Sequence, residues 1–155
     1  MKAELVETQR HMQRLGIRGN FTKPENMHLT LAFIGEYPGP EDILDVINEI
    51  RFEPFAIGLD GMGSFGNLWW AGIRGQEALK PLAKSLRHGL AEAGIPFDRK
   101  KFTPHITLVR RPISPDGRIP AAVLQHALKS EMIVDRISLM RSDRGKNGMI
   151  YTEIE

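Results

Sequence analysis

Two short segments of this sequence each place a threonine two positions after a histidine. His28 and Thr30 stand in HLTL, and His105 and Thr107 stand in HITL. If each segment is a β-strand, side chains two positions apart point to the same face and lie about 6.5–7 Å apart. A phosphate group fits between such a pair, within reach of both the imidazole and the hydroxyl.

Two imidazoles and two hydroxyls are suited to breaking a phosphodiester bond. A neutral imidazole takes a proton from the attacking water, and an imidazolium gives a proton to the departing oxygen. The hydroxyls donate hydrogen bonds to the non-bridging oxygens, where charge is held in the transition state. Because the pKa of an unperturbed histidine is about 6.5, both protonation states are accessible near neutral pH. The pattern therefore predicts acid-base phosphodiester chemistry.

The repetition of the motif favours a functional reading over chance. A single His-x-Thr strand is more often a half-exposed strand with no function, because short motifs recur by accident. Here two of only five histidines share the same context, about half a chain length apart. The two copies indicate an internal duplication, with halves centred on residues 28–31 and 105–108.

A metal site is the weaker alternative. The chain has no cysteine, and the residue two positions after each motif histidine is threonine, which is a poor zinc ligand. Glu25 is the carboxylate close to His28 in sequence. We expect no metal and no cofactor, and we expect the other histidines to be surface or packing residues. These are His11, His88 and His126.

Composition indicates an ordinary folded protein. Of the 155 residues, 41% are hydrophobic and 26% are charged, which fits one domain. No apolar run approaches the roughly 18–20 residues of a membrane span, and charges interrupt the first 16 residues as they would not in a signal peptide. We expect a cytoplasmic protein that does not bind membranes.

Charge is locally uneven although the net charge is only +2. Residues 99–101 are Arg-Lys-Lys and precede the second motif, and Arg110 and Arg111 follow it. Such a cluster of charges either lies at the solvent-exposed edge of the protein without a specific role or contacts an anionic substrate.

Periodicity predicts the elements that position the motifs. Helices are expected at 3–15, 40–51, 77–93 and 121–130, and Pro81 is tolerable only in the first turn of its helix. Alternation turns Leu29, Leu31 and Phe33 to a core, and puts Trp69 and Trp70 on opposite faces. Interleaved helices and hairpins predict an α+β fold with mainly antiparallel sheets. Strands are expected at 28–34, 54–60, 68–74, 104–110, 133–140 and 149–154.

The segments PENMHLTLAFIG and FTPHITLVR resemble the paired signatures of the 2H phosphoesterase superfamily. More narrowly, they resemble the RNA 2′,3′-cyclic phosphodiesterases, also named 2′-5′ RNA ligases, and the tail from Arg136 resembles that family's closing hairpin. The resemblance implies one bilobal domain over residues 1–155, with two pseudo-symmetric lobes of antiparallel sheet, helices outside and a central cleft. Family chains open with an apolar strand, which we expect to be absent here because a helix is predicted at once.

The resemblance also implies a role for each motif residue. His28 corresponds to the general acid and His105 to the general base, and Thr30 and Thr107 hold the phosphate. Arg110 matches a phosphate-contacting position. Phe33 matches an aromatic residue at the nucleotide pocket, against the alternation argument above.

The implied reaction is metal-independent hydrolysis of RNA 2′,3′-cyclic phosphate ends to 2′-phosphates. Some family members also join RNA through a 2′-5′ linkage without ATP. The expected partners are RNA ends, including tRNA fragments, or small cyclic nucleotides.

Two alternatives stay open. The chain could be a relative that acts on a different cyclic phosphate or on a 2′-5′ oligonucleotide. It could also be an RNA-binding module without activity. Finally, we expect a monomer, or a dimer if a partner chain covers the missing strand.

Overall fold

The computed structural model describes all 155 residues, and they form two compact units. The first unit comprises Met1–Leu29, Ala56–Arg74 and Pro104–Met132, and the second comprises Thr30–Phe55, Gly75–Thr103 and Ile133–Glu155. Helices and antiparallel strands alternate along the chain, so the predicted α+β class is confirmed.

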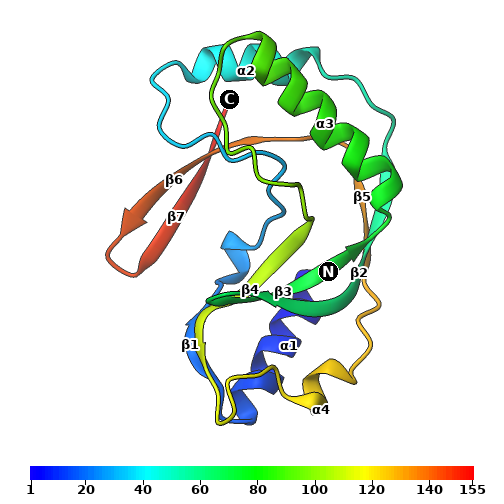
Figure 1. Ribbon diagram of the computed structural model, residues 1–155, viewed down its shortest axis with the longest axis vertical. Coiled ribbons are helices and arrows are strands. Elements are labelled where there is room, and N and C mark those ends of the chain that lie inside the picture. Colours follow the sequence, from blue (N-terminus) through cyan, green and yellow to red (C-terminus); the bar gives the residue numbers. More distant parts are fainter. The chain divides into compact units, whose positions relative to one another are not determined.

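The first unit is built on a five-stranded sheet with the order β1-β4-β3-β2-β5 (Figure 1). The β1–β4, β4–β3 and β3–β2 pairs are antiparallel. Of these strands, only the first residue of β2 and the second half of β5 belong to the second unit. The strands are β1 (Arg18–Phe21), β2 (Phe55–Phe65), β3 (Leu68–Arg74), β4 (His105–Ile113) and β5 (Glu131–Val134).

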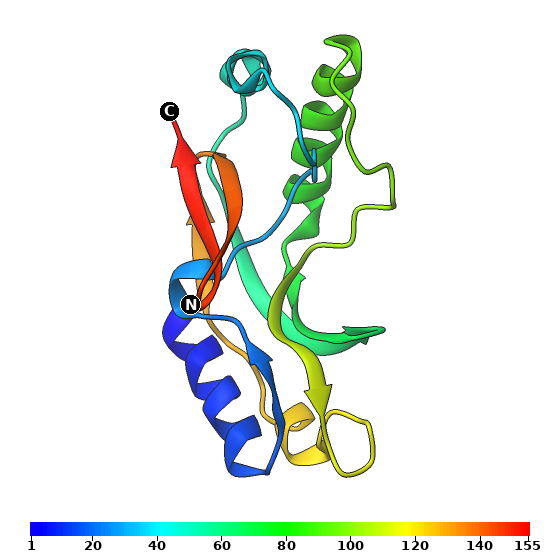
Figure 2. The same ribbon diagram turned by 90° about the vertical axis from the view of Figure 1, so that its left-hand side faces the viewer.

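Two helices belong to the first unit, α1 (Lys2–Arg14) and the single turn α4 (Ala121–Leu124), with a 3-10 turn η1 at Pro24–Asn26. Figure 2 shows α1 running beside β1. The buried side of α1 carries Leu5, Thr8, Gln9 and Met12, whose spacing by three and four positions follows the helical period. The core that Leu5 and Met12 join contains Ile17, Ile57, Leu59, Trp69, Ala71, Ile73, Ile106, Leu108, Val109, Val123 and Leu128.

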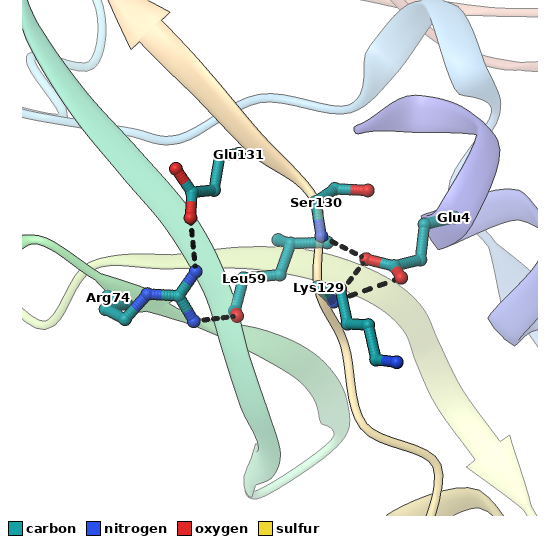
Figure 3. A network of polar contacts seen from close by, with 6 residues as sticks. All are labelled: Glu4, Leu59, Arg74, Lys129, Ser130 and Glu131. Carbon is teal, nitrogen blue, oxygen red and sulfur yellow. Dashed lines mark hydrogen bonds and ion pairs between the residues drawn. The ribbon is translucent and has the colours of Figure 1, made fainter.

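Polar contacts tie the start of α1 to the start of β5 (Figure 3). The Glu4 carboxylate accepts hydrogen bonds from the backbone N–H groups of Lys129, at 2.9 Å, and Ser130, at 2.8 Å. Burial pushes the pKa of Glu4 upward, but the hydrogen bonds from Ser130 and Lys129 outweigh it, and the pKa is lowered. On the neighbouring strands, Arg74 donates to the Leu59 carbonyl and pairs with Glu131 at 3.1 Å.

The second unit packs two helices, α2 (Pro40–Glu49) and α3 (Gln76–Glu92), against each other, with the hairpin of β6 (Leu139–Gly145) and β7 (Gly148–Ile154). Ile43 and Val46 of α2 meet Leu86 and Leu90 of α3 in its core. Acidic residues in the first turn of α2, Glu41 and Asp42, match the positive end of the helix dipole. Partly buried residues around this core include Leu31, Ile34, Ile47, Phe97, Ile137 and Leu139.

The predicted strand at 28–34 is wrong. Only one residue of it pairs, in an isolated antiparallel bridge between Leu29 and Ile106. The reason is that β1 already pairs with β4 from Val109 onward, so the later segment finds only a short free stretch of that edge. Phe33 is 60% exposed, so its predicted place in the core is wrong as well.

Other boundaries also differ from the predictions. The helix with Pro81 begins at Gln76, so the proline is its sixth residue and does not lie in the first turn. Pro81 is exposed, so its ring stays out of the core. The predicted strand 133–140 is two strands in different sheets, β5 and the start of β6, and β1 was not predicted. The predicted helix 121–130 shortens to four residues. None of the helices has the length and apolar character that crossing a bilayer demands.

Candidate functional site

Strand β4 presents the second motif as the alternation predicts. Ile106 and Leu108 are buried, while His105 and Thr107 are half-exposed on the opposite face. The cross-strand partners agree, because the buried Ile106 faces the buried Ala71 of β3. His105 and Thr107 therefore share the face of the sheet that points away from the core of the first unit. We call it the open face.

A bulge in β4 then changes which residues share that face. Thr107 pairs with Trp70 and Val109 pairs with Trp69, so Leu108 is an extra residue without a partner in β3. Without the bulge, a residue five positions after His105 would point to the core face. With it, both Leu108 and Val109 are buried, and Arg110 is exposed opposite Leu68. Arg110 thus joins His105 and Thr107 on the open face.

Neighbouring groups hold the bulge and the residue after Arg110. The carbonyl of Leu108 accepts hydrogen bonds from the buried side chain of Gln9, at 2.9 Å, and from the backbone N–H of Thr22, at 2.9 Å. Arg111 is the one non-glycine residue with a positive φ, 52°, and its N–H donates to the Asn67 carbonyl at 2.6 Å. The position of Arg110 is therefore set by the backbone on both sides of it.

The first motif reaches the same face through the Leu29–Ile106 bridge. In an antiparallel pair, directly opposed side chains share a face, and the residues next to them share the other face. His28, one position before Leu29, is thus opposite Thr107, one position after Ile106. The exposure of the His28 side chain agrees with this placement. The structure brings four predicted residues together within the first unit: His28, His105, Thr107 and Arg110.

The hydrogen bond of His28 defines its tautomer. Its Nδ1 lies 2.6 Å from the carbonyl oxygen of Asn26. A carbonyl only accepts, so Nδ1 carries a proton in this contact. This leaves Nε2 as the ring atom that can exchange a proton with a ligand.

Aromatic side chains surround the imidazole of His105. Phe65 of β2 meets it edge-on, with ring centroids 5.2 Å apart, and the Trp70 indole lies 6.0 Å away. Gly63 faces Trp70 across the hairpin, and a Cβ at this position would collide with the indole. Trp69 is only 4% exposed and points to the core, so the predicted opposite placement of the two tryptophans is confirmed.

Phe65 is a site residue that the sequence-based prediction missed. The predicted strands at 54–60 and 68–74 leave Phe65 in the connection between them. In the structure the turn is only Gly66–Asn67, and Phe65 pairs with Leu68. A two-residue Gly-Asn turn is a known hairpin signal, and counting from it would have put Gly63, Phe65 and Trp70 on one face.

The other two predicted residues, Thr30 and Phe33, belong to the second unit. Thr30 directly follows the bridging Leu29, and its side chain is exposed. The Phe33 carbonyl accepts a hydrogen bond from the N–H of Asp98 at 2.8 Å, which leaves the ring at the surface of the second unit.

No group of three His, Asp or Glu side chains is placed to share a metal ion, and we assign no ligand set. The remaining histidines lie on or next to helices. His88 pairs with Glu92 of the same helix, and His11 and His126 lie at the surface near α1 and α4.

Comparison with known proteins gives a family match over most of the chain. The model of the 2′-5′ RNA ligase superfamily matches residues 7–146. A protein of Thermus thermophilus named RNA 2′,3′-cyclic phosphodiesterase is 35% identical, over 100% of this chain and 82% of the relative. A protein of the same name from Methanothermobacter thermautotrophicus is 33% identical, over 87% of this chain and 79% of the relative.

Solved structures share the fold. The crystal structure of TT0787 from Thermus thermophilus superimposes with a TM-score of 0.81 at 34% identity, covering 99% of this chain and 88% of that one. Escherichia coli LigT in complex with 3′-AMP also reaches a TM-score of 0.81, covering 100% of this chain and 90% of that one. At 24% identity, that second likeness concerns the fold alone.

Proposed function

The chain belongs to the 2′-5′ RNA ligase superfamily, and we propose that it hydrolyses the 2′,3′-cyclic phosphate at RNA ends without a metal ion. Two relatives that share a third of their residues with it are named for this activity. The observation that carries the proposal is the common open face of His28, His105, Thr107 and Arg110, which depends on the Leu29 bridge and the Leu108 bulge.

The proposed reaction uses the two histidines in opposite protonation states. His105 takes a proton from water as the water oxygen attacks phosphorus. The bond from phosphorus to the 3′ oxygen breaks, and His28 gives its Nε2 proton to that oxygen. The products are a 2′-phosphate and a free 3′-hydroxyl, and proton exchange with solvent resets both imidazoles. The Asn26 carbonyl supports the acid, because its bond to Nδ1 fixes the ring with Nε2 as the atom that donates.

The other predicted residues bind the phosphate and the nucleotide. Thr107 and Arg110 donate hydrogen bonds to the non-bridging oxygens in this proposal. The contact from the Arg110 guanidinium is charge-assisted and is therefore stronger than that from the Thr107 hydroxyl. Thr30 takes the same role by its position in the repeated motif. We assign Phe33 to substrate binding, because its exposed ring can stack on a base.

Ligation uses the same groups with a different nucleophile. If the 5′-hydroxyl of a second RNA replaces water, His105 accepts its proton, the 3′ oxygen leaves with the proton of His28, and a 2′-5′ linkage forms. No ATP is needed, because the bond energy of the cyclic phosphate drives the transfer. We propose hydrolysis as the main reaction because water is the more abundant nucleophile.

Single alanine variants of the two histidines test the proposal with 2′,3′-cyclic mononucleotides and a short RNA with a cyclic end. Since a positioned acid or base contributes about 10²–10⁴-fold, His28→Ala and His105→Ala should each lower kcat by a factor in that range. His88→Ala is the matched control, because this exposed histidine pairs only with Glu92 on its own helix. Far-ultraviolet circular dichroism should be unchanged in all three.

Two results would contradict the proposal. Turnover that disappears with EDTA and returns with a divalent metal would exclude the metal-free mechanism. Tight RNA binding by the wild-type protein with no turnover of any cyclic phosphate would instead identify an RNA-binding module. A substrate panel that includes 2′-5′ oligonucleotides separates the proposed substrate from others of the superfamily.

A further inference from the structure

One stretch of the second unit is far more basic than the rest of the protein. Residues 80–101 contain six Lys or Arg and only two acidic residues, although the whole chain has a net charge of +2. Both acidic side chains are already engaged: Glu92 pairs with His88 at 3.2 Å, and Asp98 accepts the backbone N–H of Lys100 at 2.9 Å. We call the six cations the basic strip: Lys80, Lys84, Arg87, Arg99, Lys100 and Lys101.

The cations of the strip lie on one helix face and on the segment bonded to it. Lys80, Lys84 and Arg87 are spaced by four and three positions along α3, so they share a face. Arg87 links this face to the following segment, because its guanidinium donates to the carbonyl of Lys100 at 2.7 Å and to that of Leu31 at 3.2 Å. The strip is therefore continuous from the helix into residues 99–101.

Aromatic rings hold two of the guanidiniums in place. Phe97 has Arg99 over its ring at 4.8 Å and Arg87 at 5.8 Å, and Phe102 has Arg87 at 5.7 Å. Two guanidiniums thus share one ring, and none of the ion pairs in the structure neutralises a residue of the strip. Like charges that no ion pair neutralises repel one another, and a bound polyanion would relieve that repulsion.

We propose that the basic strip binds the phosphates of a single-stranded RNA, upstream of the cyclic end that reacts. The inference rests on the proposed function only in taking RNA as the substrate. Lys80 and Arg87 are about 10 Å apart along the helix axis at 1.5 Å per residue, which matches about three nucleotides at 3.4 Å of rise each. The backbone of Phe33 is bonded to Asp98 beside the strip, and its exposed ring suits base stacking.

Fluorescence anisotropy with a labelled RNA of about ten nucleotides ending in a 2′-phosphate measures the binding without turnover. The test variant combines Lys80→Ala, Lys84→Ala and Arg99→Ala, which leaves the bonds of Arg87 intact. Each cation contributes about 0.7 to the slope of log K against log salt for a single strand. The triple variant should therefore lose about 2 from that slope. When salt is raised from 50 to 200 mM, the factor by which RNA affinity falls should be about 20-fold smaller for the triple variant than for the wild type.

The matched control removes three cations from α1, with Lys2→Ala, Arg10→Ala and Arg14→Ala, and its slope should stay at the wild-type value. Thermal unfolding checks that both triple variants are folded. An unchanged slope in the strip variant, or equal losses in both variants, would overturn the proposal. So would tighter binding to a duplex RNA, or strip-dependent binding to anionic lipid vesicles instead of RNA.

Kinetics separate the strip from the proposed activity. The strip variant should hydrolyse a 2′,3′-cyclic mononucleotide at the wild-type rate, and its KM for the RNA substrate should rise about tenfold or more at low salt. If the wild type hydrolyses neither substrate while the salt slopes of the variants still differ as expected, the proposed function is wrong and RNA binding by the strip is supported. If both substrates are hydrolysed and the salt slopes of the wild type and the strip variant are equal, RNA binding by the strip is wrong and the proposed function is supported.

Discussion

The packing of Trp70 over Gly63 makes a sharp prediction for Gly63→Ala. An added Cβ would lie 2.5 Å from the indole Cη2 and 3.0 Å from Cε2, whereas ordinary contact begins at 3.4 Å. The indole must therefore move by about 1 Å, and overpacking of this kind costs roughly 1–3 kcal/mol. Because the same indole and Phe65 flank His105, the imidazole loses its support on that side.

A displacement of about 1 Å in a catalytic group can cost up to roughly 100-fold in rate. We expect kcat/KM for a 2′,3′-cyclic mononucleotide to fall about 10- to 100-fold in Gly63→Ala. The Tm should fall by about 2–4 °C for each kcal/mol of strain, which leaves the protein folded at assay temperature. The same two measurements on Ser64→Ala provide the control, because Ser64 is exposed and points to the other face.

A Gly63→Ala variant with wild-type kcat/KM would refute this reasoning, whatever its Tm. It would mean either that the indole shifts without moving His105, or that His105 is not a reacting group. Loss of activity in Ser64→Ala as well would show that the strand tolerates no change, and would remove the evidence for a specific role of Trp70.

Two further predictions concern the supports of the first unit. Gln9 is 5% exposed and donates hydrogen bonds to the carbonyls of Thr22 and Leu108. Gln9→Leu should therefore lower the free energy of unfolding by about 1–3 kcal/mol in urea titrations, and should raise the KM for cyclic substrates because Arg110 is displaced. A loss of stability with an unchanged KM would show that the bulge does not contribute to substrate binding. The lowered pKa of Glu4 means that its contribution is fully present above the ordinary value of 4.5 and is lost as pH falls through the folded pKa. Glu4→Gln should therefore lower the free energy of unfolding at pH 7, measured by urea titration, by at most about 1 kcal/mol because the group is partly exposed. The difference from wild type should shrink as the pH falls below 4.5.

The helices could be predicted because their apolar residues recur with a period that tolerates errors at the ends. Ile43 in α2 is buried as its spacing indicates. The same holds for four leucines of α3: Leu79, Leu82, Leu86 and Leu90. The strands were harder, since a strand exists only if a partner edge is free. The segment after His28 alternates as well as β4 does, yet it pairs at one residue, because β1 occupies most of the edge it would need.

The candidate site could be predicted by residue type, but its geometry only in part. The repeated His-x-Thr pattern identified His105 and Thr107 on one face, and the structure agrees. It could not predict that Arg110 shares that face, since a period of two argues against an odd spacing and the bulge leaves no obvious trace in sequence. Phe65 was missed because the Gly-rich stretch before Trp69 was read as a long turn, when most of it is strand.

The extra residue in β4 has a consequence for how related sequences are compared. A spacing of five between histidine and arginine places both side chains on one surface only where a bulge intervenes, as it does here at Leu108. In a homologue whose strand is regular, the equivalent arginine would stand four or six positions after the histidine, and an alignment without gaps would miss it. Deleting Leu108 from this chain should likewise leave a regular strand, in which Arg110 stands four positions after His105 and stays on the open face.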